Sequence, residues 1–222
     1  MLVATTRHSS KSKEAEGHSY KMSLKVFTVL STPIPGSVNI DRIVTLLKEH
    51  RPNVVIVCGV SSYRNLFDLW SNIYGLLQLE DDIYNIRFLK KRGRYISGSW
   101  QSIETQICVG GIDSKNPLQN YERLRSTAPN WCRYALIVSI YPPKGSRCSK
   151  VRILGKELSI GIHSLLDFSQ LFSKTVILVC NNSLKDEICI DNASDNLVIV
   201  ALKKEVTVIT IDFETLNVEV VT

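Results

Sequence analysis

The sequence lacks most of the motifs on which common enzyme chemistries depend. Neither of the Gly-rich phosphate-binding motifs, Gly-x-x-x-x-Gly-Lys-Ser and Gly-x-Gly-x-x-Gly, is present, and no serine lies in a nucleophile elbow. The six cysteines form no Cys-x-x-Cys pair and have no histidine at ligand spacing. None of the four histidines, His8, His18, His50 and His163, follows a strand-like apolar run. These absences argue against a P-loop enzyme, a dinucleotide-binding enzyme and a serine hydrolase.

Long apolar segments are also absent. The longest runs, Val54–Val60 and Thr175–Cys180, are too short to cross a bilayer. Residues 1–22 are polar and lack the apolar core of a secretory signal, so we expect a disordered extension there and one domain over residues 23–222. We expect a cytoplasmic protein that does not associate with membranes. The net charge of +6 permits an acidic partner or nucleic acid without requiring one.

The cysteines are expected to be structural. Cys58, Cys108 and Cys180 each lie at or near the end of an apolar run, where a free thiol packs as a small hydrophobic group. We therefore expect buried, unpaired thiols at these positions, in preference to metal ligands or redox-active pairs.

From residue 24 onward, strand and helix patterns alternate along the chain. Strands are expected at 24–30, 53–60, 82–89, 135–140 and 175–180, in a hairpin of 95–104 with 105–112, and in a C-terminal β-meander of 196–202, 205–214 and 216–221. Helices are expected at 40–50, with Asn39 as N-cap, and at 66–79, 121–126 and 161–172. This order predicts an α/β fold, a layered α/β sandwich with two packed mixed sheets flanked by helices.

The segment Ala135–Lys150 is the most informative, because its apolar run breaks into Tyr-Pro-Pro-Lys-Gly. It resembles the strand-to-loop passage of calcineurin-like metallophosphoesterases, in which a metal-binding histidine precedes an aromatic-Pro-Pro-x-Gly turn. The order and spacing of the other strands over residues 24–222 are similar to that family as well. For an active member the resemblance implies two metal ions, held by Asp, His and Asn at the ends of the strands, that activate water and clamp a phosphoryl group.

The residues at the family's ligand positions are poor metal ligands in this sequence. They are Ser31, Pro33, Val60, Leu89, Ile140, Asn182 and Leu184. We therefore expect no metal or other cofactor and no catalysis, with aliphatic side chains filling the vacated pocket. The family's inactive members serve as subunits of larger complexes, so the resemblance implies a non-catalytic scaffold or subunit that binds another protein. The alternatives are an active metal-dependent phosphoesterase with an atypical site and a nucleic-acid-binding protein.

Two basic segments are candidate binding surfaces. The first contains Lys90, Lys91, Arg92 and Arg94, followed by Tyr95 and Trp100; the second contains Lys144 and Arg147. Basic residues interleaved with aromatics are typical of nucleic-acid contacts, although a solvated turn is the commoner explanation. By analogy with the family, both segments are expected at the rim of the former active site. The adjacent acids Asp81 and Asp82 are expected to be solvated in a loop.

Overall fold

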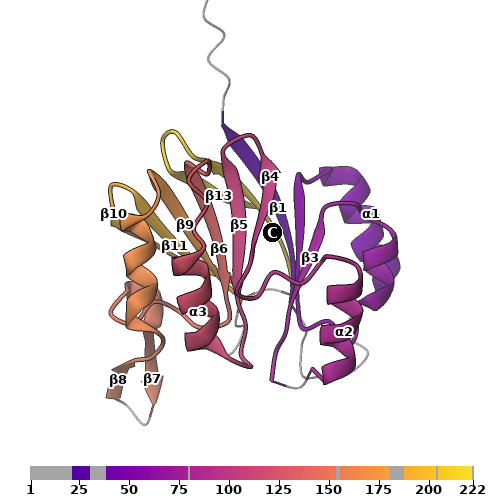
Figure 1. Ribbon diagram of the computed structural model, residues 1–222, viewed down its shortest axis with the longest axis horizontal. Helices are drawn as coiled ribbons and strands as arrows, with labels where there is room; N and C mark the ends of the chain where they lie inside the picture. The colour runs from indigo at the N-terminus through magenta and orange to yellow at the C-terminus, as the bar shows by residue number, and fades with distance from the viewer. Residues whose placement is uncertain are drawn as a thin grey trace, which may run out of the picture.

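The computed structural model describes residues 22–30, 39–79, 81–153, 156–180, 188–203 and 205–221. Two large sheets pack against each other, and helices cover their outer faces (Figure 1). The predicted layered α/β sandwich is therefore confirmed. The extension expected over residues 1–22 lies, apart from Met22, outside the described residues, so the domain boundary stays a prediction. Among the described residues, no helix is long and apolar enough to span a membrane.

The five-stranded sheet has the order β13-β12-β1-β2-β3. Its strands are β1 (Ser23–Leu30), β2 (Val54–Cys58), β3 (Ile73–Leu76), β12 (Val206–Asp212) and β13 (Asn217–Val221). The first three run parallel to one another, and the hairpin of β12 and β13 continues the sheet in antiparallel pairing. Its outer face carries α1 (Ile40–His50), the 3-10 helix η1 (Arg64–Asp68) and α2 (Ile83–Lys91).

The six-stranded sheet has the order β10-β11-β9-β6-β5-β4. Its strands are β4 (Trp100–Glu104), β5 (Ile107–Ile112), β6 (Tyr134–Ser139), β9 (Lys174–Val179), β10 (Cys189–Ser194) and β11 (Leu197–Ala201). Its outer face carries α3 (Pro117–Ser126) and the 3-10 helix η3 (His163–Gln170). A short 3-10 helix, η2 (Arg147–Ser149), leads into a separate hairpin of β7 (Lys150–Ile153) and β8 (Lys156–Ser159).

Strand alternation divides the core into an inner layer and two outer layers. In β2, for example, Val54, Ile56 and Cys58 face the space between the sheets, whereas Val55 and Val57 face the helices. This is the result expected when successive side chains of a strand point to opposite faces. Because both faces of the central strands are buried, their sequences are continuous apolar runs without a polar alternation.

Two predicted elements are wrong. Residues 82–89, expected as a strand, form most of α2, because the Asp82 side chain caps the helix by accepting from Asn85 N at 3.0 Å. Asn85 and Leu89, four residues apart, are its buried face. Residues 66–79, expected as a helix, contain the end of η1 and then the fully buried strand β3, which pairs in parallel with β2.

Other expectations have mixed outcomes. The hairpin of 95–104 with 105–112 is confirmed as β4 and β5, and Asn39 caps α1 as predicted, accepting from Asp41 N at 2.9 Å. The C-terminal β-meander is wrong: β11 belongs to the six-stranded sheet, where it pairs with β9 and β10, and only β12 and β13 form a hairpin. The strand β10 and the hairpin of β7 and β8 were not expected from the sequence.

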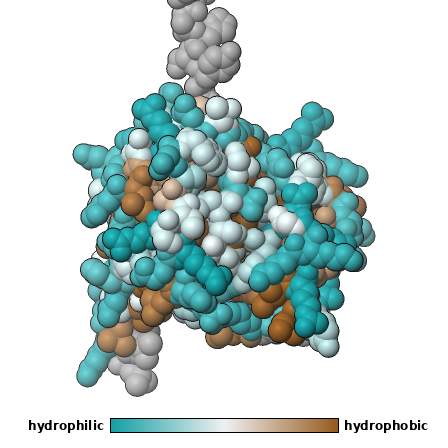
Figure 2. Space-filling view, viewed as in Figure 1, coloured by the Kyte–Doolittle hydropathy of each residue, from teal (hydrophilic) through white to brown (hydrophobic). Residues whose placement is uncertain are grey.

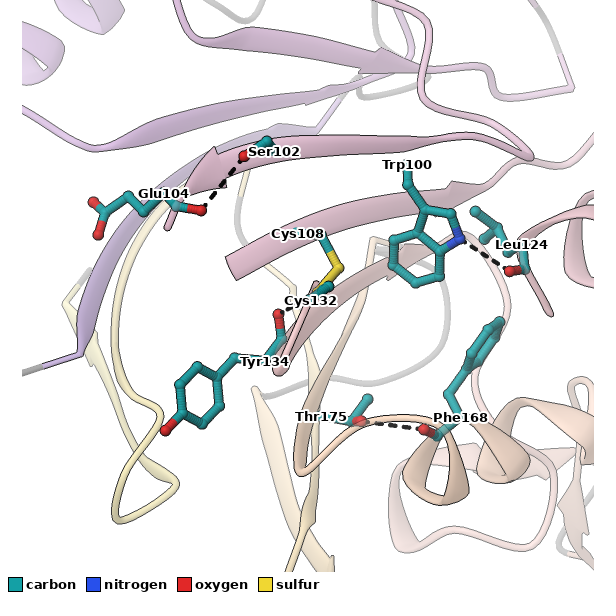
Figure 3. Close-up of a disulfide and its surroundings, with 9 residues drawn as sticks. All are labelled: Trp100, Ser102, Glu104, Cys108, Leu124, Cys132, Tyr134, Phe168 and Thr175. Atoms are coloured by element: carbon teal, nitrogen blue, oxygen red, sulfur yellow. Dashed lines mark hydrogen bonds between the residues drawn. A yellow bond between two sulfur atoms is a disulfide. The ribbon is translucent and has the colours of Figure 1, made fainter. Parts of the chain in front are cut away.

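Two disulfides correct the expectation about the cysteines. Cys108 bonds Cys132 and Cys148 bonds Cys189, whereas Cys58 and Cys180 are free and buried as predicted. The first disulfide ties β5 to the segment before β6, beside the indole of Trp100, whose Nε1–H donates to the Leu124 carbonyl at 2.9 Å (Figure 3). The second ties η2 to the edge strand β10.

Candidate functional site

The carboxyl ends of the parallel strands gather at one edge of the sandwich, which is the lower edge in Figure 1 and is called here the carboxyl edge. The Ser114 hydroxyl, just after β5, donates to the carbonyl of Leu77, just after β3, at 3.1 Å and so joins the two sheets there. In α/β proteins ligands bind where parallel strands end, so a functional site is expected at this edge.

A buried carboxylate, that of Asp81, lies at the carboxyl edge and is 3% exposed. The backbone N–H of Val60 donates to both of its oxygens at 3.1 Å, and the backbone N–H of Ser61 donates at 3.0 Å. Three further donors complete its surroundings: the Ser61 hydroxyl at 2.8 Å, the backbone N–H of Gln78 at 2.9 Å and the Asn85 amide at 3.1 Å. The carboxylate thereby holds together the ends of β2 and β3 and the start of α2.

This arrangement corrects the expectation that Asp81 is a solvated loop acid. Backbone N–H groups that converge on one point form a concave anion site, and in this chain the occupant is the protein's own carboxylate. A charge-assisted network of this kind stabilises a buried anion, because each donor replaces a water molecule that burial removes. Asp82, by contrast, is exposed and serves as the N-cap of α2.

A second buried carboxylate, Asp113, directly follows β5. It accepts from the Tyr95 hydroxyl at 2.6 Å, the Asn120 amide at 2.9 Å and the Lys115 backbone N–H at 3.0 Å. Burial, and then the hydrogen bond to Asp113, raise the pKa of Tyr95 well above its ordinary value. Tyr95 is therefore a neutral donor, and Asp113, like Asp81, is occupied by groups of the chain itself.

The free thiols of Cys58 and Cys180 meet between the sheets at the same edge. Cys58 ends β2, Cys180 follows β9, and both side chains are fully buried. Burial, and then a hydrogen bond with the Cys180 thiol, raise the pKa of Cys58. Because the thiolate is the reactive form of cysteine, Cys58 is an unreactive core group in the folded protein.

Three of the aliphatic residues predicted to fill the pocket, Val60, Leu89 and Ile140, lie in the described part of the chain; all three are buried, but not all together. Val60 and Leu89 both contact Gly75 of β3 on the face covered by helices. Ile140 instead packs between the sheets. Leu89 lies on α2 and not after a strand, so its assignment to a ligand position is wrong; the residues that follow β3 are Leu77 and Gln78. Four further positions, Ser31, Pro33, Asn182 and Leu184, lie outside the described residues.

The two basic segments do not form a common rim. The first basic segment lies at and beyond the C-terminus of α2, a helix that leads away from the carboxyl edge. It consists of Lys90, Lys91, Arg92 and Arg94. Lys144 and Arg147 follow β6 and lead into β7, whose hairpin lies on the opposite side of the molecule from α2 in Figure 1. The expected convergence is therefore wrong, because it depended on a strand at 82–89.

Potential metal ligands are sparse at the carboxyl edge. Over the part of the chain that the structure describes, no three or more His, Cys, Asp or Glu side chains gather closely enough to hold a metal ion. Of the polar groups that lie there, Asp81, Asp113, Ser114 and Glu205 are each engaged by partners from the same chain.

No family model and no curated protein sequence matches this chain. Similarity appears at the level of solved structures. One crystal structure superposes with a TM-score of 0.63 at 10% identity, covering 90% of this chain and 99% of the other. A second, TT1561 of Thermus thermophilus, has a TM-score of 0.55 at 8% identity, covering 90% of this chain and 98% of the other. At such identities the likeness shows the fold alone.

Proposed function

We propose that this chain is a non-catalytic domain of the calcineurin-like phosphoesterase type, which acts as a scaffold or subunit by binding another protein. The observation that carries the proposal is the occupation of Asp81. A metal-dependent hydrolase needs carboxylates at the strand ends whose oxygens are open to cations. Here the Asp81 oxygens are turned toward the backbone N–H groups of Val60, Ser61 and Gln78. This function requires no cofactor.

A cluster of exposed apolar side chains supports the protein-binding part of the proposal. Leu79 is 70% exposed, Ile83 58% and Leu118 64%. Leu79 and Ile83 flank the start of α2, and Leu118 is linked to them through Lys115, three residues before it, whose ammonium group donates to the Leu79 carbonyl. Figure 2 shows hydrophobic surface along the lower edge, beneath α2. Exposed apolar groups gathered at one place are typical of contact surfaces.

A hydrolysis assay tests the non-catalytic part. Purified protein is incubated with an aryl phosphate in the presence of Mn²⁺, Fe²⁺ or Zn²⁺, and its metal content is measured after purification. We expect no bound metal and no turnover above that of the Asp81→Asn variant. Metal-dependent turnover by the wild-type protein would instead favour an active phosphoesterase with an atypical site.

A capture experiment tests the protein-binding part. Wild-type protein and the double variant Leu79→Glu/Ile83→Glu are used as baits in an extract of the source cell. Leu158→Glu/Ile190→Glu is the matched control, since these residues are also exposed and apolar but lie on β8 and β10. We expect one stoichiometric partner to be lost from the first variant only. Identical capture by all three baits would contradict the proposed surface.

The cytoplasmic location is part of the proposal, and the two disulfides are the observation that weighs against it. Disulfides persist in oxidising compartments and are rare in the cytosol, with intracellular proteins of hyperthermophiles as the exception. Fractionation of the source cell tests the location directly, and recovery of the protein outside the cytoplasm would contradict it.

A further inference from the structure

One face of α2 carries alternating aromatic and cationic side chains, which are exposed except for that of Phe88, which is partly buried against the core. Tyr84, Arg87, Phe88 and Lys91 recur at spacings of three and four residues, which places them in one stripe along the helix. The opposite face carries the buried residues Asn85 and Leu89. Tyr84 is 65% exposed, so its ring is available to a partner. We call these four residues the α2 stripe.

Neighbouring cations extend the positive charge around the α2 stripe. The guanidinium of Arg92 lies 4.1 Å from the centroid of the Phe88 ring, and that of Arg64 lies 5.6 Å from it. Each of these arginines also approaches an acid: Arg92 lies 3.2 Å from Asp68, and Arg64 lies 3.9 Å from Asp82. These contacts fix the Phe88 ring and partly neutralise its two arginines.

The two cations within the stripe are in a different situation. Arg87 and Lys91 are both exposed, and within the described part of the chain neither makes an ion pair. Lys90, on the adjacent face, lies 5.6 Å from the centroid of the Tyr95 ring. The surface thus combines uncompensated positive charge with an exposed aromatic ring, and Figure 2 shows hydrophilic side chains over this part of the molecule.

We propose that the α2 stripe binds single-stranded nucleic acid, with Arg87 and Lys91 contacting phosphates and Tyr84 stacking on a base. Cations that follow the backbone, interleaved with aromatic rings that stack on bases, are the recurrent solution for binding single strands without sequence preference. An acidic peptide would use the cations but would have no use for the exposed ring of Tyr84. The stripe adjoins the apolar cluster around Leu79, since Ile83 lies one turn before Arg87 on α2, but it uses different side chains, so this binding is additional to the proposed protein contact.

The test measures binding of the full chain to fluorescent oligo-dT and oligo-U of about 20 nucleotides by anisotropy. Affinity is followed over about 50–200 mM salt, because each phosphate contact on a single strand contributes about 0.7 to the slope of log affinity against log salt. Arg87→Glu/Lys91→Glu should lower the slope by about 1.4. Tyr84→Ala should weaken binding about fivefold or more with the slope unchanged, because it removes stacking and not charge.

The control is Arg125→Glu/Lys156→Glu, which changes the net charge equally. Arg125 lies in the last turn of α3, as Lys91 lies in the last turn of α2, and Lys156 is exposed on β8. This control should keep the wild-type slope. The proposal is overturned if the wild-type protein does not bind the oligonucleotides, if both double variants lower the slope equally, or if a polyglutamate peptide binds through Arg87 and Lys91 while Tyr84→Ala changes nothing.

Discussion

Both oxygens of the Asp81 carboxylate accept the backbone N–H of Val60, each at 3.1 Å. Val60 lies two residues beyond Cys58, the last residue of β2, at a position where the resemblance implies a metal ligand. The anion at this strand end comes from the loop before α2, and backbone N–H groups bind it. A carboxylate in this position stabilises the strand end and contributes to folding.

Asp81→Asn tests this structural role. The amide keeps one carbonyl oxygen but turns an N–H₂ group toward the backbone donors of Val60 or Gln78, whichever way it is oriented. Because donors then face each other in a buried site, we expect a loss of about 2–3 kcal/mol in the free energy of unfolding. Urea denaturation measures this loss.

Asp82→Asn is the matched control, since Asn and Asp are equally good N-caps, and its effect on the free energy of unfolding should be below about 0.5 kcal/mol. Equal effects of the two changes would show that Asp81 has no special structural role.

The contact of Leu89 and Val60 with Gly75 gives a second prediction. A Cβ at position 75 would lie 2.7 and 2.9 Å from the Leu89 methyl groups and 3.1 Å from a Val60 methyl. Gly75→Ala should therefore cost about 1–3 kcal/mol by overpacking. In a Leu89→Ala background the cost should fall by at least about 0.5 kcal/mol, because the crowded methyl groups are gone.

The control for this cycle is Gly110→Ala in the six-stranded sheet, whose Cβ would meet Leu124 of α3 and Trp100 of β4. Its cost should add to that of Leu89→Ala, since the two sites share no partner. The same denaturation measures the free energies of unfolding of all variants. If the costs of Gly75→Ala and Leu89→Ala simply added, the packing of Val60 and Leu89 around β3 would be contradicted.

The sequence predicts the layered sandwich because the central strands are continuous apolar runs. The prediction fails at residues 82–89, where strand-favouring composition competes with a helical period and an N-cap. Residues 82–89 contain many strand-favouring side chains, yet Ile83, Ile86 and Leu89 recur every three residues behind the N-cap Asp82. That helical period was available in the sequence. β10 was not predictable in this way, because half of its side chains are polar and its pairing with β11 defines it.

The site depends on tertiary contacts that no local pattern encodes. The sequence shows two adjacent acids, and only the convergence of Val60 and Gln78 from two strands decides that Asp81 is the buried one. The disulfides are separated by 24 and 41 residues in the chain, and cysteine positions alone do not determine their connectivity.

A thiol titration tests the cysteine assignments. Without reductant the native protein should expose no reactive thiol, because Cys58 and Cys180 are fully buried. In denaturant without reductant, two thiols should react with a chromogenic disulfide reagent, and after full reduction all six should react. Cys58→Ser/Cys180→Ser should show none in denaturant without reductant. Six reactive thiols in the unreduced wild-type protein would contradict both disulfides.

The hydrogen bond from Tyr95 to Asp113 predicts a dependence of stability on alkaline pH. Because the folded state raises the pKa of Tyr95 above its ordinary value of about 10, the unfolded chain loses this proton first as the pH rises. The stability that Tyr95 contributes is therefore complete below about pH 10 and decreases above it. Tyr95→Phe should be less stable at neutral pH, since Asp113 loses a donor, and its stability should fall less steeply between about pH 10 and 11.5 than that of the wild type.

Tyrosinate absorbance gives an independent readout of the Tyr95 proton. In the folded protein at about pH 11, Tyr95→Phe should leave the absorbance unchanged, whereas in denaturant it should remove the signal of one of eight tyrosines. A loss of signal from the folded variant would show that Tyr95 ionises normally and that the bond to Asp113 does not hold its proton.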